Sequence, residues 1–356
     1  MEHTSRRAFI STGTRAAAGL AMFAAGGGIL AACGSDKAKS SSEGTTGGST
    51  PPVATVRTGF SWIPDVEWGS WYMAESQGFF TANQIKSTLI HGGPNTPAVS
   101  QLIAGGGAEI GLAADELEII KANAAGSDYV ILGASYQRSP FGYCWLADTP
   151  ISKPADLVGK RIGGVQGDQI RIDAVFKINK LPVEYTFVPM SYDPQPLVDG
   201  EMDVITAYVT NQPISLGLQG VKTKSTTFSD FGLTTYGDVI FAPRAWLAAN
   251  RDVAVRYFKA LIAGAEANVA DPTKVIPLLM SNYGKDAELD EKFETAANPA
   301  YIALMTSDFT KTHGLLSIDL DRVKNSVYPA YEAAGETNLP DVSKLFDTTI
   351  ADDARK

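Results

Sequence analysis

Short apolar runs alternate with amphipathic stretches from residue 53 onward. The apolar runs have lengths and compositions typical of strands and lie at residues 53–60, 85–90, 108–114 and 129–136. The stretches between them have helical periodicity and lie at residues 68–77, 96–104 and 116–123. Asp115 and Glu118 are spaced as a capping box at the start of the third stretch. Strand, helix, strand at this spacing predicts right-handed crossovers and a mostly parallel sheet.

A second alternation begins near Phe141, and a helical tail follows it. Its predicted strands lie at residues 142–148, 160–165, 184–190 and 202–209, with helices at 154–159 and 168–179. From Arg251 onward the pattern is helical, at residues 252–270, 274–283, 287–304 and 320–334. Two α/β units and a helical tail predict two lobes with a cleft between them, the tail packing back on the first lobe.

The first 52 residues have the composition of a targeting segment followed by a spacer. Arg6 and Arg7 precede an apolar stretch rich in alanine and glycine, and that stretch ends in Leu-Ala-Ala-Cys at Cys33. The arginine pair resembles a twin-arginine export signal, and the final tetrad resembles a bacterial lipobox. A membrane-spanning anchor is the alternative, but large aliphatic residues are scarce there. We therefore predict a signal peptide over residues 1–32, a lipid on Cys33, a flexible tether over residues 33–52, and a protein held at the outer face of the cell membrane.

Composition narrows the possible chemistry. The net charge of −9 disfavours nucleic acid and anionic lipid as partners. With Cys33 assigned to a lipid, Cys144 has no partner for a disulfide, and its apolar strand predicts a buried, inert thiol. Three scattered histidines predict no metal site, and the chain has neither a nucleophile elbow nor a phosphate-binding Gly-Lys-Ser/Thr loop. We therefore predict a protein that is not an enzyme and has no cofactor.

Several phrases of the sequence resemble one family. "ISKPADLVGKRIGG" at residues 151–164 and "AEIGLAADELEIIKANAAG" at residues 108–126 resemble the periplasmic-type substrate-binding proteins of ABC importers. "DGEMDVITAYVTNQPISL" at residues 199–216 and "SWIPDVEWGSWYMAESQGFF" at residues 61–80 resemble the subfamily that binds pyrimidine precursors of thiamine, which is related to alkanesulfonate binders. The start of the first helix departs from that pattern at Trp68.

The resemblance implies an α/β fold of the two-lobed periplasmic-binding-protein type II. The first lobe would be residues 53–138, the second lobe residues 139–236, and residues 237–356 would complete the first lobe and add C-terminal helices. It also implies a monomer that delivers a small molecule to a membrane permease.

Ligands of open α/β sheets bind beyond the carboxyl ends of the strands, and that rule selects the candidate residues. The predicted ligand-binding residues are Trp62, Asp65, Trp68, Asn95, Asp115, Gln166, Asp168, Tyr208, Asn211, Gln212, Tyr236 and Asp238.

Each candidate has a plainer alternative. Trp62 is expected to stack on a flat ligand, or else to close the edge of the lobe. Trp68 is expected to reach the ligand from a helix start, whereas Trp71 and Tyr72 are expected in the core. The carboxylates are alternatively helix caps, and Asn95 is alternatively a turn residue.

The polar candidates also bear on ligand charge. The negative charge of Asp168 at a helix start disfavours an anion there. Hydrogen bonds to the donors and acceptors of a ligand ring are expected from Tyr208, Asn211 and Gln212. Alternatively, these three residues are polar groups at the start of a helix. Tyr236 and Asp238 are expected at the site or at the hinge.

The sequence thus favours a lipoprotein that binds a small heteroaromatic nutrient, such as a thiamine-related pyrimidine or a flavin-like ring. A binder of alkanesulfonate, taurine or nitrate is the alternative, with Arg138 and Arg171 as the anion contacts. An enzyme of pyrimidine synthesis on the same fold is a third hypothesis, which the export signal disfavours.

Overall fold

A computed structural model describes residues 50–356 of the chain. The predicted signal peptide, the lipid on Cys33 and nearly all of the predicted tether lie outside the described residues. Within the described part of the chain, no helix is both long enough and apolar enough to span a bilayer.

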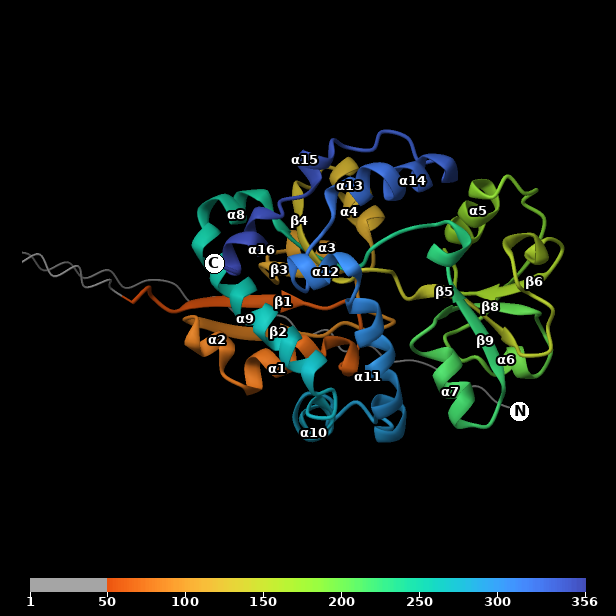
Figure 1. Cartoon of the computed structure of the whole chain (residues 1–356), viewed down its shortest axis with the longest axis horizontal. Coiled ribbons are helices and arrows are strands. Elements are labelled where there is room, and N and C mark those ends of the chain that lie inside the picture. Colours follow the sequence, from red (N-terminus) through yellow and green to blue (C-terminus); the bar gives the residue numbers. More distant parts are fainter. Residues whose placement is uncertain (1–49) are drawn as a thin grey trace, which may run out of the picture. The chain divides into compact units, whose positions relative to one another are not determined.

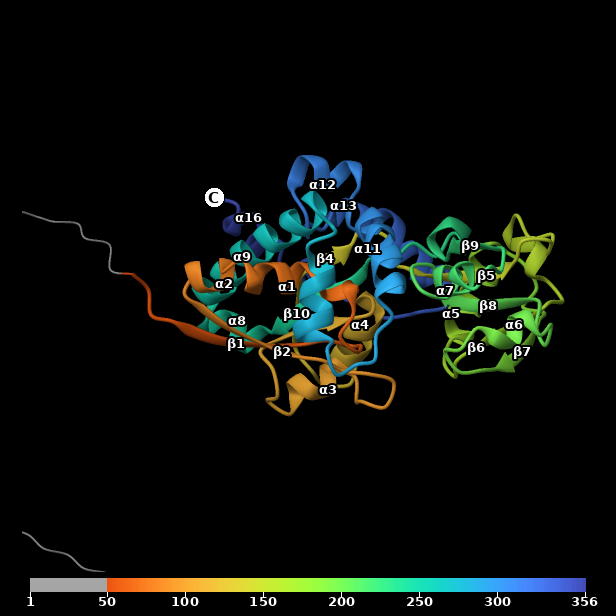
Figure 2. The same ribbon diagram turned by 90° about the horizontal axis from the view of Figure 1, so that it is seen from below.

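The first sheet combines the first four strands with one strand from late in the chain. Its order is β2-β1-β3-β10-β4, and Figure 2 shows β10 lying among strands that precede it by a hundred residues or more, two of which are labelled in Figure 1 as β3 and β4. The strands are β1 (Ala54–Gly59), β2 (Ile85–Ile90), β3 (Ile110–Ala113), β4 (Tyr129–Tyr136) and β10 (Gly237–Pro243). The strand β1 pairs in parallel with β2 and β3, whereas β10 is antiparallel to β3 and β4.

The second sheet has the same design. Its order is β7-β6-β8-β5-β9. The strands are β5 (Phe141–Leu146), β6 (Arg161–Gly164), β7 (Thr186–Pro189), β8 (Val204–Tyr208) and β9 (Thr223–Thr227). The strand β6 pairs in parallel with β7 and β8, and β5 is antiparallel to β8 and β9. The predicted fold of two mostly parallel sheets flanked by helices is confirmed.

Each antiparallel strand is the first one that the chain forms after it passes from one sheet to the other. The chain leaves β4 for β5 and later returns from β9 to β10. We call residues 50–138 and 237–356 lobe 1, and residues 139–236 lobe 2. Two connections therefore join the lobes.

Short helices follow the strands of both lobes, as the alternating pattern predicts. In lobe 1 they are η1 (Val66–Trp68), α1 (Gly69–Ser76), α2 (Phe79–Ala82), α3 (Val99–Ala104) and α4 (Glu116–Ala124). In lobe 2 they are η2 (Pro154–Leu157), α5 (Gln169–Ile178), α6 (Gln195–Val198), α7 (Gln212–Leu218) and η3 (Ser229–Phe231). Asp115 caps α4, its side chain accepting a hydrogen bond from the backbone N–H of Glu118 as the capping box predicts.

The C-terminal region is helical throughout. It comprises α8 (Arg244–Ala249), α9 (Arg251–Ala270), α10 (Val275–Leu278), η4 (Leu279–Tyr283), α11 (Glu291–Met305), α12 (Asp308–His313), α13 (Leu320–Arg322), η5 (Val323–Val327), α14 (Tyr328–Ala334), α15 (Val342–Leu345) and α16 (Thr349–Ala354). The long helix α9 packs on α1 and α2 of lobe 1 (Figure 1), as predicted for the tail. A Cβ on Gly264 would lie 2.2 Å from the carbonyl oxygen of Ser70, so this close approach requires glycine.

The tail also contacts lobe 2, which the sequence did not predict. The helix α14 packs against α5, and α11 packs against α7. The ammonium group of Lys177 on α5 donates to the carbonyl of Ala334 at the end of α14, at 3.0 Å. Lobe 2 is therefore held by helices of lobe 1 as well as by the two connections.

The core of lobe 1 contains the aromatic stripe of the first helix. Trp71 and Tyr72 are fully buried, as predicted. The indole N–H of Trp71 donates to the hydroxyl of Tyr257 at 2.7 Å, and that hydroxyl lies 2.7 Å from the hydroxyl of Thr58. The stripe thus joins the first sheet to α9 through hydrogen bonds between buried side chains.

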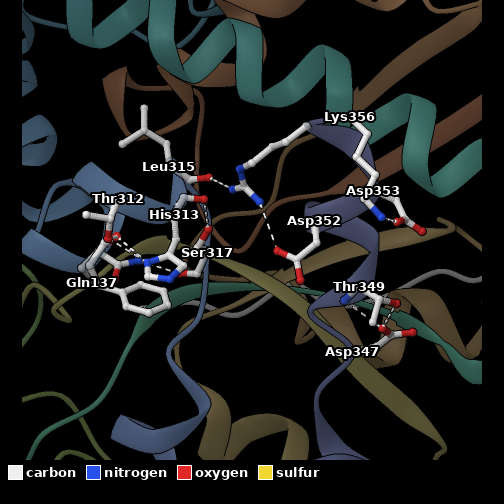
Figure 3. A network of polar contacts seen from close by, with 12 residues as sticks. Gln137, Thr312, His313, Leu315, Ser317, Asp347, Thr349, Asp352, Asp353 and Lys356 are labelled. Atoms are coloured by element: carbon white, nitrogen blue, oxygen red, sulfur yellow. Dashed lines mark hydrogen bonds and ion pairs between the residues drawn. The ribbon is translucent and has the colours of Figure 1, made fainter.

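Gln137, at the start of the first connection, is fixed by the C-terminal region. Its backbone N–H donates to the carbonyl of Leu304, and its side-chain amide donates to the carbonyl of Ser317, both at 2.8 Å. Figure 3 shows Gln137 beside Ser317, whose hydroxyl in turn donates to the carbonyl of His313. The connection between the lobes therefore starts from a fixed point in lobe 1.

Candidate ligand-binding site

A cleft of about 490 Å³ lies at the carboxyl ends of strands from both sheets. Loops after β1, β2 and β3 supply the side of lobe 1, and loops after β6, β7 and β8 supply the side of lobe 2. The helix α11 adds Tyr301. This is the location that the strand-end rule predicts for the ligand of such a fold.

Aromatic side chains from both lobes line the cleft. The ring of Trp62 in lobe 1 lies 4.9 Å from that of Tyr192 in lobe 2, with an interplanar angle of 67°. Phe141 and Tyr208 form a second pair, 4.5 Å apart at 77°. Such surfaces provide large contact areas for the faces of a flat ring.

Six of the twelve predicted site residues line this cleft, namely Trp62, Gln166, Asp168, Tyr208, Asn211 and Gln212. The side-chain carbonyl of Gln212 accepts from the backbone N–H of Tyr208 at 2.9 Å, so part of this amide already stabilises the loop. The side chain of Asn211 does not cap α7, although Asn211 precedes that helix directly. Of the two amides, Asn211 is therefore better placed to contact a ligand.

Asp168 lines the cleft without capping its own helix. Its carboxylate accepts from the backbone N–H of Val165 at 3.1 Å and from the hydroxyl of Thr206 at 2.6 Å. The alternative of an ordinary helix cap is therefore wrong for this residue. A second negative charge at this end of α5 would be repelled.

Trp68 does not reach the cleft. The chain forms the 3₁₀ turn η1 before α1, which turns the indole of Trp68 into the core. The ring lies 4.7 Å from that of Phe60 and is fully buried, and its N–H donates to the carbonyl of Ile63 at 2.9 Å. The same turn leaves Glu67 to line the cleft instead.

Asn95 and Tyr236 also lie away from the cleft. Asn95 is exposed in the loop after β2, where its neighbours Pro94 and Thr96 form the lining. The hydroxyl of Tyr236 accepts from the backbone N–H of Asp319 at 2.9 Å, and its ring lies under the guanidinium of Arg322. Tyr236 therefore anchors the second connection between the lobes and does not line the cleft.

Asp115 joins the lobes beside the cleft. Besides capping α4, its carboxylate accepts from the guanidinium of Arg171 on α5 at 2.6 Å. That guanidinium lies 4.3 Å from the centre of the Phe141 ring. The cation at this side of the cleft is therefore paired with a carboxylate of the protein.

Arg138 does not line the cleft. It forms an ion pair with Asp230, with 3.0 Å between nitrogen and oxygen, and both side chains are exposed. The two arginines of the anion-binding hypothesis are thus both paired with acids. No group of three or more histidine, cysteine, aspartate or glutamate side chains within residues 50–356 is arranged to hold a metal ion. Cys144 is a buried free thiol, and burial raises its pKa to about 12.

Four carboxyl groups lie at and beneath the lobe 1 side of the cleft. Glu67 lines the cleft, while Asp65, Asp238 and Glu294 are buried around it. The carboxylate of Asp65 accepts a hydrogen bond from the backbone N–H of Glu67 at 3.0 Å, so Asp65 is the helix cap that was its alternative assignment. The carboxylate of Glu294 accepts from the backbone N–H of Val66 at 3.0 Å. Asp65 and Asp238 thus do not line the cleft but lie behind Glu67.

Burial and mutual repulsion favour the protonated forms of these groups. Burial raises the pKa of Asp238 and that of Glu294, each to about 7. Burial also raises the pKa of Glu67 well above its usual range, and the nearby Asp238 and Asp65 raise it further. The cluster therefore holds protons near neutral pH.

Sequence reasoning missed several residues that line the cleft. Tyr192 follows the end of β7, so the strand-end rule could have selected it. Glu67 lay beside two selected residues, but only the observed turn shows that it faces the cleft. Tyr301 comes from α11, far along the chain, and no signal in the sequence connects it to the site.

The fold and the two-lobed cleft define a chain of the periplasmic-binding-protein class, and comparisons agree with this. The periplasmic aliphatic sulphonate binding protein SsuA of Escherichia coli has a TM-score of 0.62 at 15% identity, covering 83% of this chain and 97% of its own. The Candida albicans CA3427 gene product, described as having the generic periplasmic binding protein structural fold, has a TM-score of 0.57 at 15% identity, covering 83% and 96%. At these identities the likeness shows the fold alone.

The family model described as NMT1/THI5 like matches residues 67–275, and the chain belongs to that family. The riboflavin-binding protein RibY of Chloroflexus aurantiacus is 21% identical over 235 residues, which is 64% of this chain and 66% of RibY. The match therefore spans slightly less than two thirds of that relative.

Proposed function

We propose that this chain is the extracytoplasmic solute-binding protein of an ABC-type importer and binds a small heteroaromatic nutrient. A thiamine-related pyrimidine is the preferred ligand class, and a flavin-like ring is the second. The export signal and Cys33 would hold the protein at the outer face of the membrane, where it would deliver its ligand to a permease. As a solute-binding protein, it would not be an enzyme.

One observation carries the proposal: aromatic side chains from both lobes face a cleft with a carboxylate at its lobe 1 side. Trp62 and Tyr192 are placed to contact a ring from opposite lobes, and Asn211 and Glu67 offer polar groups to its edge. Membership of the NMT1/THI5-like family and the resemblance to RibY, which is named for riboflavin, support a ring-shaped ligand.

An alkanesulfonate is the second candidate, because a sulphonate binder shares the fold. The charges of the cleft disfavour it. Glu67, Asp168 and Arg171 are the acidic and basic side chains of the lining, and Arg171 is already paired with Asp115. A sulfonate would meet two acids and an arginine that has to exchange its partner, at a cost in desolvation that its own charge would not offset.

The test is a ligand panel followed by thermal unfolding of residues 50–356. The panel holds aminopyrimidines, thiamine, riboflavin, taurine and longer alkanesulfonates. A ligand at a hundredfold excess over its dissociation constant stabilises the protein by about 2.7 kcal/mol, so we expect a clear rise in Tm with an aminopyrimidine or riboflavin.

Matched variants assign the effect to the cleft. Trp62→Ala and Asn211→Ala are expected to remove the ligand-dependent rise. Trp246→Ala is the control, since Trp246 is also half-buried in lobe 1 but does not line the cleft. A rise in Tm with sulfonates alone would contradict the proposal and show that Arg171 leaves Asp115 when ligand binds.

A further inference from the structure

The carboxyl groups beneath the cleft have a property that the proposed function does not use. Glu67 is 7% exposed and lines the cleft, and Asp238 behind it is fully buried. Among the described residues, no N–H or hydroxyl group donates to either side-chain oxygen of Asp238, and its carboxyl meets only that of Glu67. A buried carboxylate without a donor is costly, so a native structure that keeps one needs a specific reason for it.

Asp238 lies behind Glu67. Its side chain meets that of Glu67, and its charge acts on Tyr208, another residue of the cleft lining. Its backbone lies in the left-handed region, with a φ of 46°, which is uncommon for residues other than glycine. Strand β10 thus places an aspartate behind Glu67 at a conformational cost.

No cation among residues 50–356 neutralises this pair. The groups that act on Glu67 and Asp238 from the neighbouring elements are acids, namely Asp65 before η1, Glu294 on α11 and Glu118 on α4. The phenols of Tyr136 on β4, Tyr208 on β8 and Tyr301 on α11 face the same group and carry no positive charge. Arg171, which also lines the cleft, is bound to Asp115.

Asp168, the other acid of the cleft lining, differs from Glu67 in its hydrogen bonds. Asp168 accepts hydrogen bonds from the N–H of Val165 and the hydroxyl of Thr206, so the fold itself satisfies it. The carboxyls of Glu67 and Asp238 instead contact one another. Two adjacent carboxyls are stable only while they share a proton or bind a cation.

We infer that the ligand carries a protonated amine, and that this ammonium group binds Glu67 above Asp238. The inference rests on the proposed function and narrows it to a heteroaromatic ring with a basic nitrogen on a short arm. The ring would lie in the cleft against Trp62 and Tyr192, and its ammonium group would take the place of the proton that the two carboxyls share. Tyr208 and Tyr301 would add the attraction of aromatic faces for a cation.

The inference predicts a dependence on pH with a definite sign. Since the ammonium group replaces a shared proton, binding at a pH below the titration of the pair releases that proton to solution. The affinity should then rise by about tenfold per pH unit until the pair is ionised in the free protein, and stay level above that range.

Isothermal titration calorimetry with two matched pyrimidines tests this. One probe is a 4-aminopyrimidine with an aminomethyl arm, and its twin has a hydroxymethyl arm. At about pH 8 we expect the aminomethyl probe to bind at least about tenfold more tightly, and at about pH 6 we expect this preference to shrink to a few-fold. Titrations in buffers of different ionisation enthalpy should show proton release at the lower pH, which needs no variant.

Three variants locate the effect. Glu67→Gln and Asp238→Asn keep the shape of the pair and should reduce the preference to about onefold to threefold, while the hydroxymethyl probe still binds. Glu201→Gln makes the same change of charge at an exposed site and should keep the preference. Circular dichroism of each variant confirms that it is folded.

The outcomes separate this inference from the proposed function. Equal binding of both pyrimidines, binding of riboflavin alone, or no proton release would overturn the inference and leave the heteroaromatic proposal standing. A preference that persists in both carboxyl variants would overturn the assignment to Glu67 and Asp238. Binding of sulfonates alone would overturn the proposed function and this inference with it.

Discussion

The two lobes share a sheet design but differ in how deeply they bury it. In lobe 1, every residue of β3 and of the edge strand β4 is buried, whereas the other edge strand, β2, is largely half-buried or exposed. In lobe 2, the edge strands β7 and β9 are largely half-buried or exposed. Lobe 1 has the C-terminal helices in addition, and lobe 2 has no such cover of its own.

The difference divides the tasks at the cleft. Lobe 1 has enough surrounding protein to hold Asp65, Asp238 and Glu294 out of water. Lobe 2 contributes mainly loop residues, among them the exposed Gln166 and Tyr192. A deeply buried lobe can keep carboxyl groups with raised pKa values beside a ligand, whereas a shallow lobe supplies contacts that are already close to solvent.

The largest expected loss of stability comes from a substitution in the core of lobe 1. Trp71→Ala removes a fully buried indole and its hydrogen bond to Tyr257, and should lower the free energy of unfolding by about 3–5 kcal/mol. Guanidinium denaturation followed by circular dichroism measures this.

A matched pair compares the same residue type in the two lobes. Trp71→Phe loses the hydrogen bond to Tyr257, while Trp145→Phe in lobe 2 removes an indole N–H that has no partner among the described residues. Trp71→Phe should therefore cost about 1–2 kcal/mol more. Equal losses would mean that the hydrogen bond of lobe 1 adds nothing to stability.

The next effect concerns the buried charges of lobe 1. The pKa of Asp238 is raised by burial to about 7, so the folded state binds its proton more tightly than the unfolded state. The stability that comes from this proton is fully present below the usual carboxyl range and is lost as the pH rises through about 7. The free energy of unfolding of the ligand-free protein should therefore fall between about pH 5 and pH 8.

Asp238→Asn should flatten that fall by on the order of 2 kcal/mol. Asp286→Asn, at an exposed site, should leave the pH profile unchanged. Urea denaturation over the pH range measures both variants. A profile for Asp238→Asn that matches the wild-type protein would show that the aspartate does not titrate in this range.

The smallest effect concerns the ion pairs at the border of the lobes. Arg171→Gln breaks a pair in which the side chain of Asp115 is only 5% exposed, and should cost about 1 kcal/mol of unfolding free energy. Arg138→Gln breaks the exposed pair with Asp230 and should stay within about 0.5 kcal/mol.

Small-angle scattering adds a second measurement to this comparison. Because the pair of Arg171 and Asp115 joins α5 to the start of α4, its loss should raise the radius of gyration of the ligand-free protein, whereas Arg138→Gln should not. An unchanged radius for Arg171→Gln would mean that the packing of α14 on α5 holds the lobes without this pair.

Much of the fold could be predicted because each lobe is built from local patterns. The runs at β2 and β4 were predicted with their observed bounds, since alternation of apolar runs and helical periodicity is a property of neighbouring residues. The strand β9 was not predicted, because its sequence is a polar run with no apolar face, and pairing with β5 places it in the sheet. The strand β10 inserts between β3 and β4, a long-range pairing that periodicity cannot show.

The sequence by itself determined the alternation of strands and helices, the strand ends at which Trp62, Tyr208 and Asn211 lie, and the burial of Trp71, because these depend on the order of neighbouring residues. The tertiary structure alone decided that Trp68 turns inward and Glu67 outward. It alone also gathered carboxyls from β10 and α11 behind the loop after β1. The charge of the cleft arises from residues that are distant in the chain, and only packing brings them together.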